Sequence, residues 1–262
     1  MSDLYIGLMS GTSLDGVDAV LADFSGPRCQ VLRHHALGFD PDLRSELLAL
    51  NTSGADELHR AALAANALAR CYAQAVQALL QAADIPASAV QAIGAHGQTV
   101  RHRPGAFDGT GYTLQLNNPA LLAECTGIRV VADLRSRDVA AGGQGAPLVP
   151  AFHQFQFGQP GQDALVLNIG GIANLSVLRA DGSVLGFDCG PGNALMDHWC
   201  QPGRPVVRCC LRCCNRCRPS PTCIKARPKA PGATCSTLRG WSNTCATAHL
   251  RLRPMCRRHC SN

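Results

Sequence analysis

"LYIGLMSGTSLDGVDAVLADF", residues 4–24, predicts two β-strands joined by a tight turn of Gly, Ser and Thr. Apolar residues alternate with small or polar ones in the second strand, as expected where one face of a strand is buried. The next run, QVLRHHALGF (residues 30–39), adds a third predicted strand. The chain is therefore expected to begin with an antiparallel meander.

A helix and a second strand unit are predicted after the meander. Residues 56–84 carry apolar side chains at steps of three or four, which predicts an amphipathic packing helix: Leu58, Ala62, Ala65, Leu68, Tyr72, Val76 and Leu79. VQAIGAHGQTV (90–100) and IRVVADLRSRD (128–138) predict short strands ending in polar residues, with helix-like PALLAECTG (119–127) between them. This is βαβ order, in which ligands gather beyond the carboxyl ends of the strands.

The strand pattern restarts at residue 164. ALVLNIGGIANLSVLRADGSVLGFD (164–188) again predicts strand, Gly-rich turn and strand, followed by an Asp-Gly hairpin and a third strand. Two such meanders predict a duplicated α/β fold with a ligand between its halves, although chance similarity of two meanders remains an alternative. We expect a first domain over residues 1–160 and the start of a second over residues 161–200.

Charge and cysteine content divide the chain near residue 200. Residues 1–200 carry 11 Lys+Arg and 18 Asp+Glu, whereas residues 201–262 carry 13 Lys+Arg and no acid. Five cysteines lie in the first segment and ten in the second. The N-terminus lacks the apolar run of a secretory signal, and no stretch is apolar enough to span a bilayer. These features predict a cytoplasmic protein without a membrane partner.

Both glycine turns are candidate phosphate sites, because consecutive backbone N–H groups of such turns can face an anion. The first contains Gly11, Thr12, Ser13, Leu14, Asp15, Gly16, Val17 and Asp18; the second contains Asn168, Gly170 and Gly171. No lysine follows in the P-loop pattern, so neither is a Walker site. The alternative is that both are ordinary hairpins; acting together, they could hold one polyphosphate from both sides.

Other polar residues follow predicted strands. Asp188 is expected at a strand end, where a carboxylate can act as a general base; alternatively it only braces its own turn. His96, Gln98 and Thr99 follow one strand, and Asp133, Arg135, Arg137 and Asp138 follow another. These groups suit a polyhydroxylated or carboxylated ligand, since arginine pairs bidentately with carboxylates. Surface salt bridges are the alternative for the second group.

Six motifs together resemble the anhydro-N-acetylmuramic acid kinase family over about residues 4–200: GLMSGTSLDGVDAVL, IGAHGQTVRH, NPALLAECTGI, VVADLRSRDVAAGGQGAPLVPAFH, LNIGGIANLS and GFDCGPGNALMD. The resemblance implies the duplicated fold of actin-like ATPases and hexokinase-type sugar kinases, with ATP and Mg²⁺ between the domains. It implies a homodimer, no structural metal and no specific nucleic-acid partner. It also implies ATP-phosphate contacts at both turns, Asp188 as catalytic base, and substrate contacts by His96, Gln98, Thr99, Asn118, Asp133 and Arg137.

The implied reaction belongs to peptidoglycan recycling. It converts 1,6-anhydro-N-acetylmuramic acid, ATP and water into N-acetylmuramic acid 6-phosphate and ADP. A base at Asp188 would deprotonate the water that attacks the anomeric carbon, and the freed O6 would receive the phosphoryl group. Another sugar kinase or actin-like ATPase is the nearest alternative; a non-enzymatic, basic metal- or nucleic-acid-binding protein is the alternative of another class.

The tail, residues 201–262, departs from the resemblance. RCCLRCCNRC (208–217) contains C-x2-C spacings that could bind zinc, and a disulfide scaffold is a second reading. A shifted reading frame is the third reading. When permitted codons for VRCCLRCCNRC and RPKAPGATCST are read with the same shift of frame, the first stretch gives a Leu-rich run. The second gives a string resembling the family's downstream segment. On that reading the tail is expected to be disordered, the second domain truncated and turnover impaired.

Overall fold

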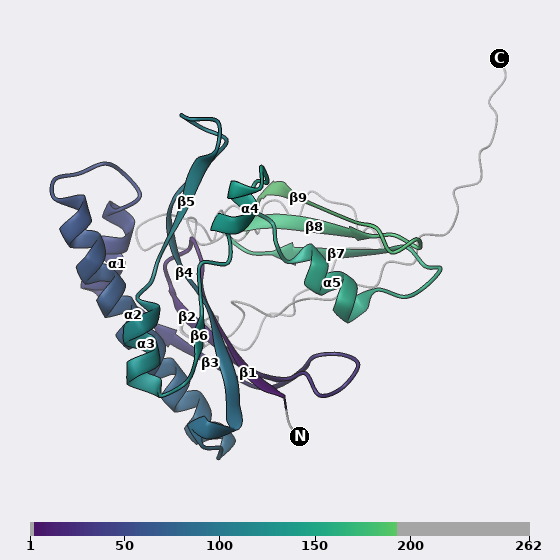
Figure 1. The fold of residues 1–262 in the computed structure, drawn as a ribbon, viewed down its shortest axis with the longest axis horizontal. Helices are drawn as coiled ribbons and strands as arrows, with labels where there is room; N and C mark the ends of the chain where they lie inside the picture. The colour runs from purple at the N-terminus through teal and green to yellow at the C-terminus, as the bar shows by residue number, and fades with distance from the viewer. Residues whose placement is uncertain (1–2, 193–262) are drawn as a thin grey trace, which may run out of the picture.

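The first sheet of the protein is a mixed sheet. A computed structural model describes residues 3–192. In this sheet β1 (Leu4–Ser10), β2 (Gly16–Asp23) and β3 (Gln30–Gly38) form the predicted antiparallel meander. The strand order is β3-β2-β1-β4-β5, with β4 (Val90–Pro104) parallel to β1 and β5 (Gly111–Leu116) antiparallel to β4. The short β6 (Val130–Val131) pairs with β4 in parallel, so the predicted mixed α/β class is confirmed (Figure 1).

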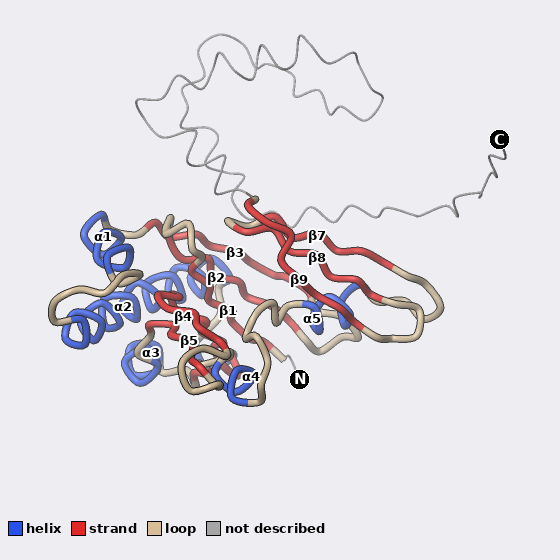
Figure 2. The backbone as a smooth tube through the Cα atoms, turned by 90° about the horizontal axis from the view of Figure 1, so that it is seen from above, coloured by secondary structure: helices blue, strands red, loops and turns tan. Residues whose placement is uncertain are grey.

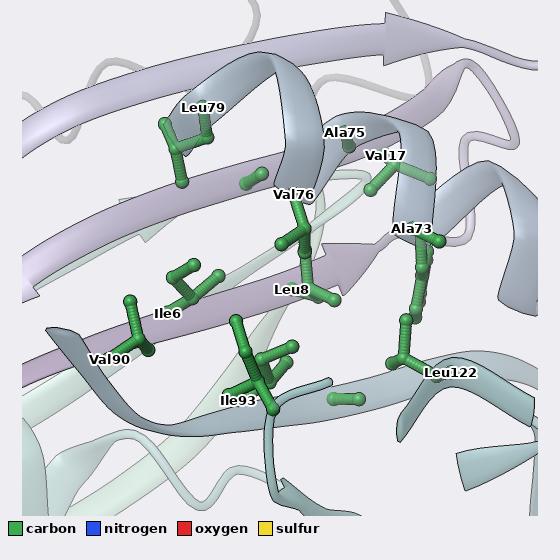
Figure 3. Close-up of a cluster of buried hydrophobic side chains, with 14 of the residues drawn as sticks. Ile6, Leu8, Val17, Ala73, Ala75, Val76, Leu79, Val90, Ile93 and Leu122 are labelled. Atoms are coloured by element: carbon green, nitrogen blue, oxygen red, sulfur yellow. The ribbon is translucent and has the colours of Figure 1, made fainter. Parts of the chain in front are cut away.

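Three helices, α1 (Pro41–Ala49), α2 (Glu57–Ala83) and α3 (Pro119–Thr126), lie together on one side of this sheet (Figures 1 and 2). A short 3₁₀ turn (Ala87–Ala89) leads from α2 into β4. The core forms between α2 and strands β1, β2 and β4, and its fully buried side chains include Ile6, Leu8, Val17, Leu68, Tyr72, Val76 and Ile93 (Figure 3). Burying each large apolar side chain contributes about 1.5–3 kcal/mol, which makes this layer the main stabilising unit.

The predicted helix over 56–84 is confirmed, but its apolar stripe was assigned too far toward the N-terminus. Leu58 is 89% exposed and Ala62 is also exposed, whereas Ala65, Leu68 and Tyr72 are buried. Ala64 packs with Leu47 and Leu50 of the α1 segment, and α2 packs on the first sheet from Leu68 onward. Periodicity identifies a face of a helix, but it does not show where the sheet beneath that face ends.

The second sheet is the predicted second meander. Its strands are β7 (Ala164–Ile169), β8 (Ile172–Leu178) and β9 (Val184–Pro191), all antiparallel. The short α4 (Ser136–Ala140) and α5 (Pro150–Phe157) lie on the connection between the sheets. α5 packs on β8 and β9, where His153 Nδ1 and Ser176 Oγ are 2.8 Å apart. A Cβ on Gly186 would lie 2.2 Å from Pro150 Cγ, so only glycine permits this contact.

Phe24 and Cys29, which lie between β2 and β3, join α5 to the first sheet. The Gln156 side chain accepts from Cys29 N at 2.9 Å and donates to Cys29 O at 3.1 Å. The Phe24 and Phe155 rings stack with centroids 6.4 Å apart. The second meander is thereby held against the first through side chains that are far apart in sequence.

Two sequence predictions require correction. The strand β5 was not predicted, so the path from β4 to β6 runs through a hairpin and α3 rather than through a simple βαβ unit. β9 extends to Pro191, which places Asp188 within the strand rather than at its end. The expected end of the second domain at residue 200 and the whole tail, residues 201–262, lie outside the described residues. Within the described part, no helix is long and apolar enough to cross a membrane.

Candidate active site

Apolar packing in the protein interior fixes the turn between β1 and β2. Leu14 has a φ of 53° and donates its N–H to Gly11 O at 3.2 Å. Its side chain is 4% exposed and packs with Leu47 and Leu50 of the α1 segment and with Val100. Arg44 Nε donates to Leu14 O at 2.9 Å. These contacts hold the backbone of the turn in one conformation without using Thr12, Ser13 or Asp15 for packing.

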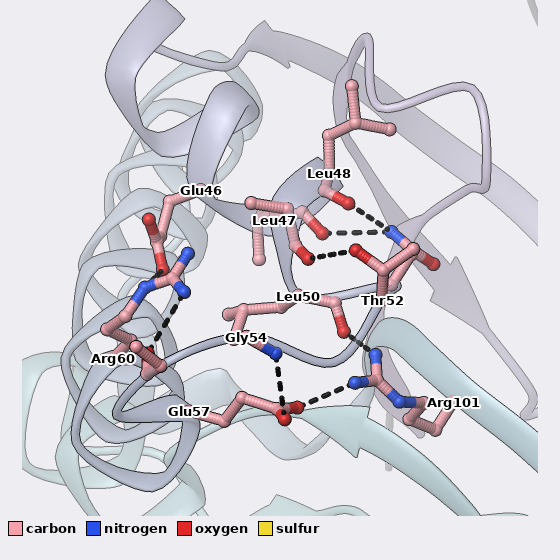
Figure 4. Close-up of polar contacts among 12 residues, drawn as sticks. Glu46, Leu47, Leu48, Leu50, Thr52, Gly54, Glu57, Arg60 and Arg101 are labelled. Atoms are coloured by element: carbon pink, nitrogen blue, oxygen red, sulfur yellow. Dashed lines mark hydrogen bonds and ion pairs between the residues drawn. The ribbon is translucent and has the colours of Figure 1, made fainter.

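α1 is itself held by ion pairs (Figure 4). Arg101 of β4 donates to Leu50 O and pairs with Glu57 Oε1 at 2.6 Å, while Arg60 Nε pairs with Glu46 Oε1 at 2.8 Å. The connection from α1 to α2 is therefore tied to the strand that also carries His96 and Gln98. This network supports the turn, and it contains none of the predicted site residues.

Buried polar contacts tie the first turn to β4. Ser10 Oγ donates to Gly97 O at 3.2 Å, which leaves Tyr72 OH as the donor to Ser10 Oγ at 2.9 Å. Burial raises the pKa of Tyr72, so it remains a neutral donor. Gln98 Nε2 donates to Gly11 O at 3.1 Å. Because Gln98 is 1% exposed, its Nε2 group supports the backbone of the turn from the protein interior and is not presented to a ligand.

The second glycine turn lies against the first, as the sequence predicted. A Cβ built on Gly171 would lie 3.0 Å from Thr12 Oγ1. Gly192 N donates to Gly171 O at 3.0 Å, and a Cβ on Gly192 would lie 2.6 Å from Gly170 O. Three glycine backbones and one threonine hydroxyl therefore meet where the two meanders face each other. The absence of side chains at these glycines lets the two turns approach each other closely.

The side chains within the first turn divide into buried and accessible groups. Leu14 and Val17 point into the core, so only their backbone groups could meet a phosphate. Ser13 Oγ donates to Asp15 Oδ1 at 2.9 Å, and Asp18 pairs with His34 Nε2 at 3.0 Å. The second turn adds Asn168 to the accessible polar groups. Among the described residues, no three His, Cys, Asp or Glu side chains are grouped to hold a metal.

Asp188 lies on β9 opposite Asn174 of β8, and its side chain is exposed. Its carboxylate is near enough to raise the pKa values of Arg135 and His102, which burial lowers. No hydrogen bond joins the Asp188 side chain to another described residue. The following turn continues beyond residue 192, outside the described residues, so the alternative that Asp188 braces this turn stays a prediction.

His96 and Arg135 form a linked pair. Arg135 Nε donates to His96 Nε2 at 2.8 Å, and His96 Nδ1 donates to Gly97 O at 2.7 Å. Burial, followed by the Arg135 charge, lowers the pKa of His96. Both nitrogens of His96 are thus used inside the protein, although the sequence suggested contact with substrate. The sequence predicts that Arg135 suits a carboxylated ligand, whereas the substrate contacts implied by the family resemblance include Arg137 and not Arg135.

The remaining predicted substrate residues differ in their surroundings. Asn118 caps α3 by accepting from Leu121 N at 3.0 Å and donates to Asn66 Oδ1 at 2.7 Å, so its amide is committed to structure. Thr99 Oγ1 accepts from Gln115 Nε2 at 3.2 Å. Asp133, with a φ of 55°, and Arg137 are exposed near α4. None of the described ion pairs joins residues 133–138 to one another, so the salt-bridge alternative gains no support.

Sequence reasoning missed polar groups that depend on β5. His102 Nδ1 and Thr113 Oγ1 are 3.0 Å apart, and Gln115 Nε2 also donates to Thr113 Oγ1 at 2.8 Å. The sequence signal that could have placed these residues beside β4 is the Asp108-Gly109 pair followed by alternating apolar residues at 112, 114 and 116. A cavity of about 800 Å³ lies elsewhere, between β3, α1 and α2, and includes none of the predicted site residues.

Comparison with known proteins relates the chain to one family. A family model described as anhydro-N-acetylmuramic acid kinase matches residues 3–205. The protein of that name from Albidiferax ferrireducens is 66% identical over 220 residues, covering 76% of this chain and 57% of the relative. The one from Variovorax paradoxus is 65% identical over 213 residues, covering 79% and 57%.

More distant resemblances come from solved structures. A reductive activator for a corrinoid, iron-sulfur protein is 14% identical with a TM-score of 0.43, covering 73% of this chain and 31% of that one. A Ppx/GppA family member from Aquifex aeolicus is 7% identical with a TM-score of 0.36, covering 76% and 54%. The chain spans a little over half the length of the two curated relatives described above. By its family match and these relatives, the chain belongs to the anhydro-N-acetylmuramic acid kinase family.

Proposed function

We propose that the described part of this chain holds the sugar-binding and hydrolytic half of an anhydro-N-acetylmuramic acid kinase. The whole reaction would open 1,6-anhydro-N-acetylmuramic acid with water and phosphorylate it at O6, within peptidoglycan recycling in the cytoplasm. The observation that carries the proposal is the approach of Gly171 to Thr12, with Asp188 facing Arg135 and His102 nearby. Phosphate-type turns and a candidate base thus meet on one side of the fold.

Asp188 would act as the general base. Its carboxylate takes a proton from water, the water oxygen bonds to the anomeric carbon, and the C1–O6 bond breaks with its electron pair going to O6. Because the Asp188 side chain is exposed, its carboxylate can approach a water in this way. The polar groups near α4 and the end of β4 would orient the sugar beside it.

The two glycine turns would hold the phosphates of ATP. ATP with Mg²⁺ supplies the phosphoryl group that O6 receives, and this transfer depends mainly on positioning and charge neutralisation. The backbone N–H groups around Gly11 and Gly170 would bind phosphate oxygens, while Thr12 adds a hydroxyl donor. Asp15, which accepts from Ser13 Oγ through one oxygen, is the turn carboxylate that would face a magnesium ion.

We further propose that residues 201–262, whose composition departs from that of residues 1–200, do not supply the rest of a working nucleotide site. Such a site normally needs apolar enclosure, which phosphate turns alone do not supply. The change in composition near residue 200 supports a shifted reading frame as the origin of the tail. A homodimer, as the family resemblance implies, remains part of the proposal for the complete enzyme.

The test separates binding from turnover. Isothermal titration of the 262-residue chain with 1,6-anhydro-N-acetylmuramic acid should give binding at one site, and Asp188→Asn should alter it little, because asparagine has nearly the same shape. ADP release with ATP and sugar should stay at background. No sugar binding in the wild-type chain would contradict the assigned half-site, whereas turnover at sugar-kinase rates would contradict the impairment.

A further inference from the structure

Arg135 is fixed by two neutral acceptors at the start of α4. Its Nε–H donates to His96 Nε2 at 2.8 Å, and Nη1 donates to Gly145 O. Because the carbonyl of Gly97 can only accept, His96 Nδ1 must carry the ring proton, which leaves Nε2 as a lone pair for Arg135. The histidine is therefore neutral in this arrangement and does not offset the arginine charge.

The guanidinium of Arg135 has no carboxylate partner within the part of the chain that the structure describes. The ion pairs there are His34–Asp18, Arg60–Glu46 and Arg101–Glu57. The acid nearest in sequence, Asp138, accepts from Gly145 N at 2.7 Å and is committed to the loop. Asp188 influences Arg135 from a greater distance than an ion pair.

Among the described arginines that are not exposed, Arg60 and Arg101 each pair with a carboxylate, whereas Arg135 does not. Arg101 also donates to a backbone carbonyl, but its second contact is the Glu57 carboxylate at 2.6 Å. Burial lowers the pKa of Arg135, because holding its positive charge away from water is unfavourable in free energy. A partly buried cation with only neutral partners becomes more favourable when an anion approaches.

The free N–H groups of Arg135 suit a carboxylate. Of its five N–H groups, two are used, and the other three have no partner among the described residues. They include both N–H groups of Nη2 and one of Nη1, which form a fork that can donate to two carboxylate oxygens. The fork is held in place by His96 and Gly145 before any ligand arrives, so little side-chain freedom is lost on binding.

We propose that Arg135 binds the carboxylate of the acidic 1,6-anhydro sugar and thereby sets the preference for it over a neutral analogue. The inference rests on the proposed function and adds the residue that recognises the acid group, with His96 positioning that residue. The exposed Arg137, which the sequence favoured, lies within α4 and is not preorganised by a described hydrogen bond.

The experiment compares two ligands on the full 262-residue chain. Isothermal titration measures 1,6-anhydro-N-acetylmuramic acid against 1,6-anhydro-N-acetylglucosamine, which lacks the lactyl carboxylate. The wild-type chain should prefer the acid at least about 10-fold, and Arg135→Gln should reduce the ratio to near one while leaving the neutral sugar unchanged. Arg129→Gln, an exposed arginine outside the site, is the matched control and should retain the preference.

Each outcome decides the inference. A retained preference in Arg135→Gln, or equal losses for both sugars, would overturn it while leaving the proposed function intact. If neither sugar binds the wild-type chain, the proposed function fails and this inference with it. Circular dichroism checks folding; if Arg135→Gln is unfolded, Arg135→Lys replaces it, because lysine keeps the charge but lacks the fork. An unchanged preference in that variant also overturns the proposal.

Discussion

Gly16→Ala should unfold the turn that carries the candidate phosphate site. A Cβ at this position would lie 2.2 Å from Leu37 O and 2.9 Å from Gly38 Cα. The first distance is about 1 Å inside van der Waals contact, and a backbone oxygen in a strand cannot rotate away. Relief requires parting β2 from β3 where Gly16 pairs with Gly38. We expect a loss of about 3 kcal/mol, as for severe overpacking.

Urea unfolding followed by circular dichroism measures this loss. With a slope of about 2–3 kcal/mol/M, a 3 kcal/mol loss moves the midpoint down by about 1 M. Gly7→Ala is the matched control, because Gly7 lies in β1 of the same hairpin and a Cβ there meets nothing within 4 Å. That variant should be neutral or more stable by about 0.5 kcal/mol, since alanine restricts the unfolded chain. Equal midpoints for the two variants would refute the argument from close approach.

Three further predictions follow from the site and the sequence. In a version with its reading frame restored, Asp188→Asn should lower turnover at least about 100-fold, and near-normal turnover would remove Asp188 from the role of base. Because burial lowers the pKa of His96 in the folded state, the unfolded chain takes up the proton first as the pH falls. Stability present above roughly pH 6.5 should therefore decline as the pH falls below that value, and urea midpoints of His96→Asn should show a smaller decline. Sequencing the gene should reveal one inserted or deleted base near the codon for Cys200, and an intact frame there would contradict the account of the tail.

The meanders could be predicted from sequence because their signals are local. Alternation around Gly11 and the Asp181-Gly182 turn identified strands and hairpins, and the structure confirms both. The approach of Gly171 to Thr12 followed from treating the two meanders as halves of one fold. In these cases the spacing of residues along the chain was enough to predict the strands and their turns.

The use of individual polar side chains could not be predicted in the same way. Asn118 and His96 occur in motifs next to strands, yet tertiary contacts commit the first to Asn66 and α3 and the second to Arg135. β5 carried a local signal that the prediction overlooked, because Tyr112, Leu114 and Leu116 alternate with polar residues after the Asp108-Gly109 pair. A polar residue near a strand end is therefore a candidate until its partners are known.

A crystal structure of the 262-residue chain with bound 1,6-anhydro-N-acetylmuramic acid would test the central claim most directly. The account predicts the sugar between β9 and the end of β4, with its anomeric carbon one water molecule away from Asp188. Its carboxylate should meet Arg135, and its O6 should point toward the two glycine turns. A sugar bound instead in the cavity between β3, α1 and α2, remote from Asp188, would contradict it.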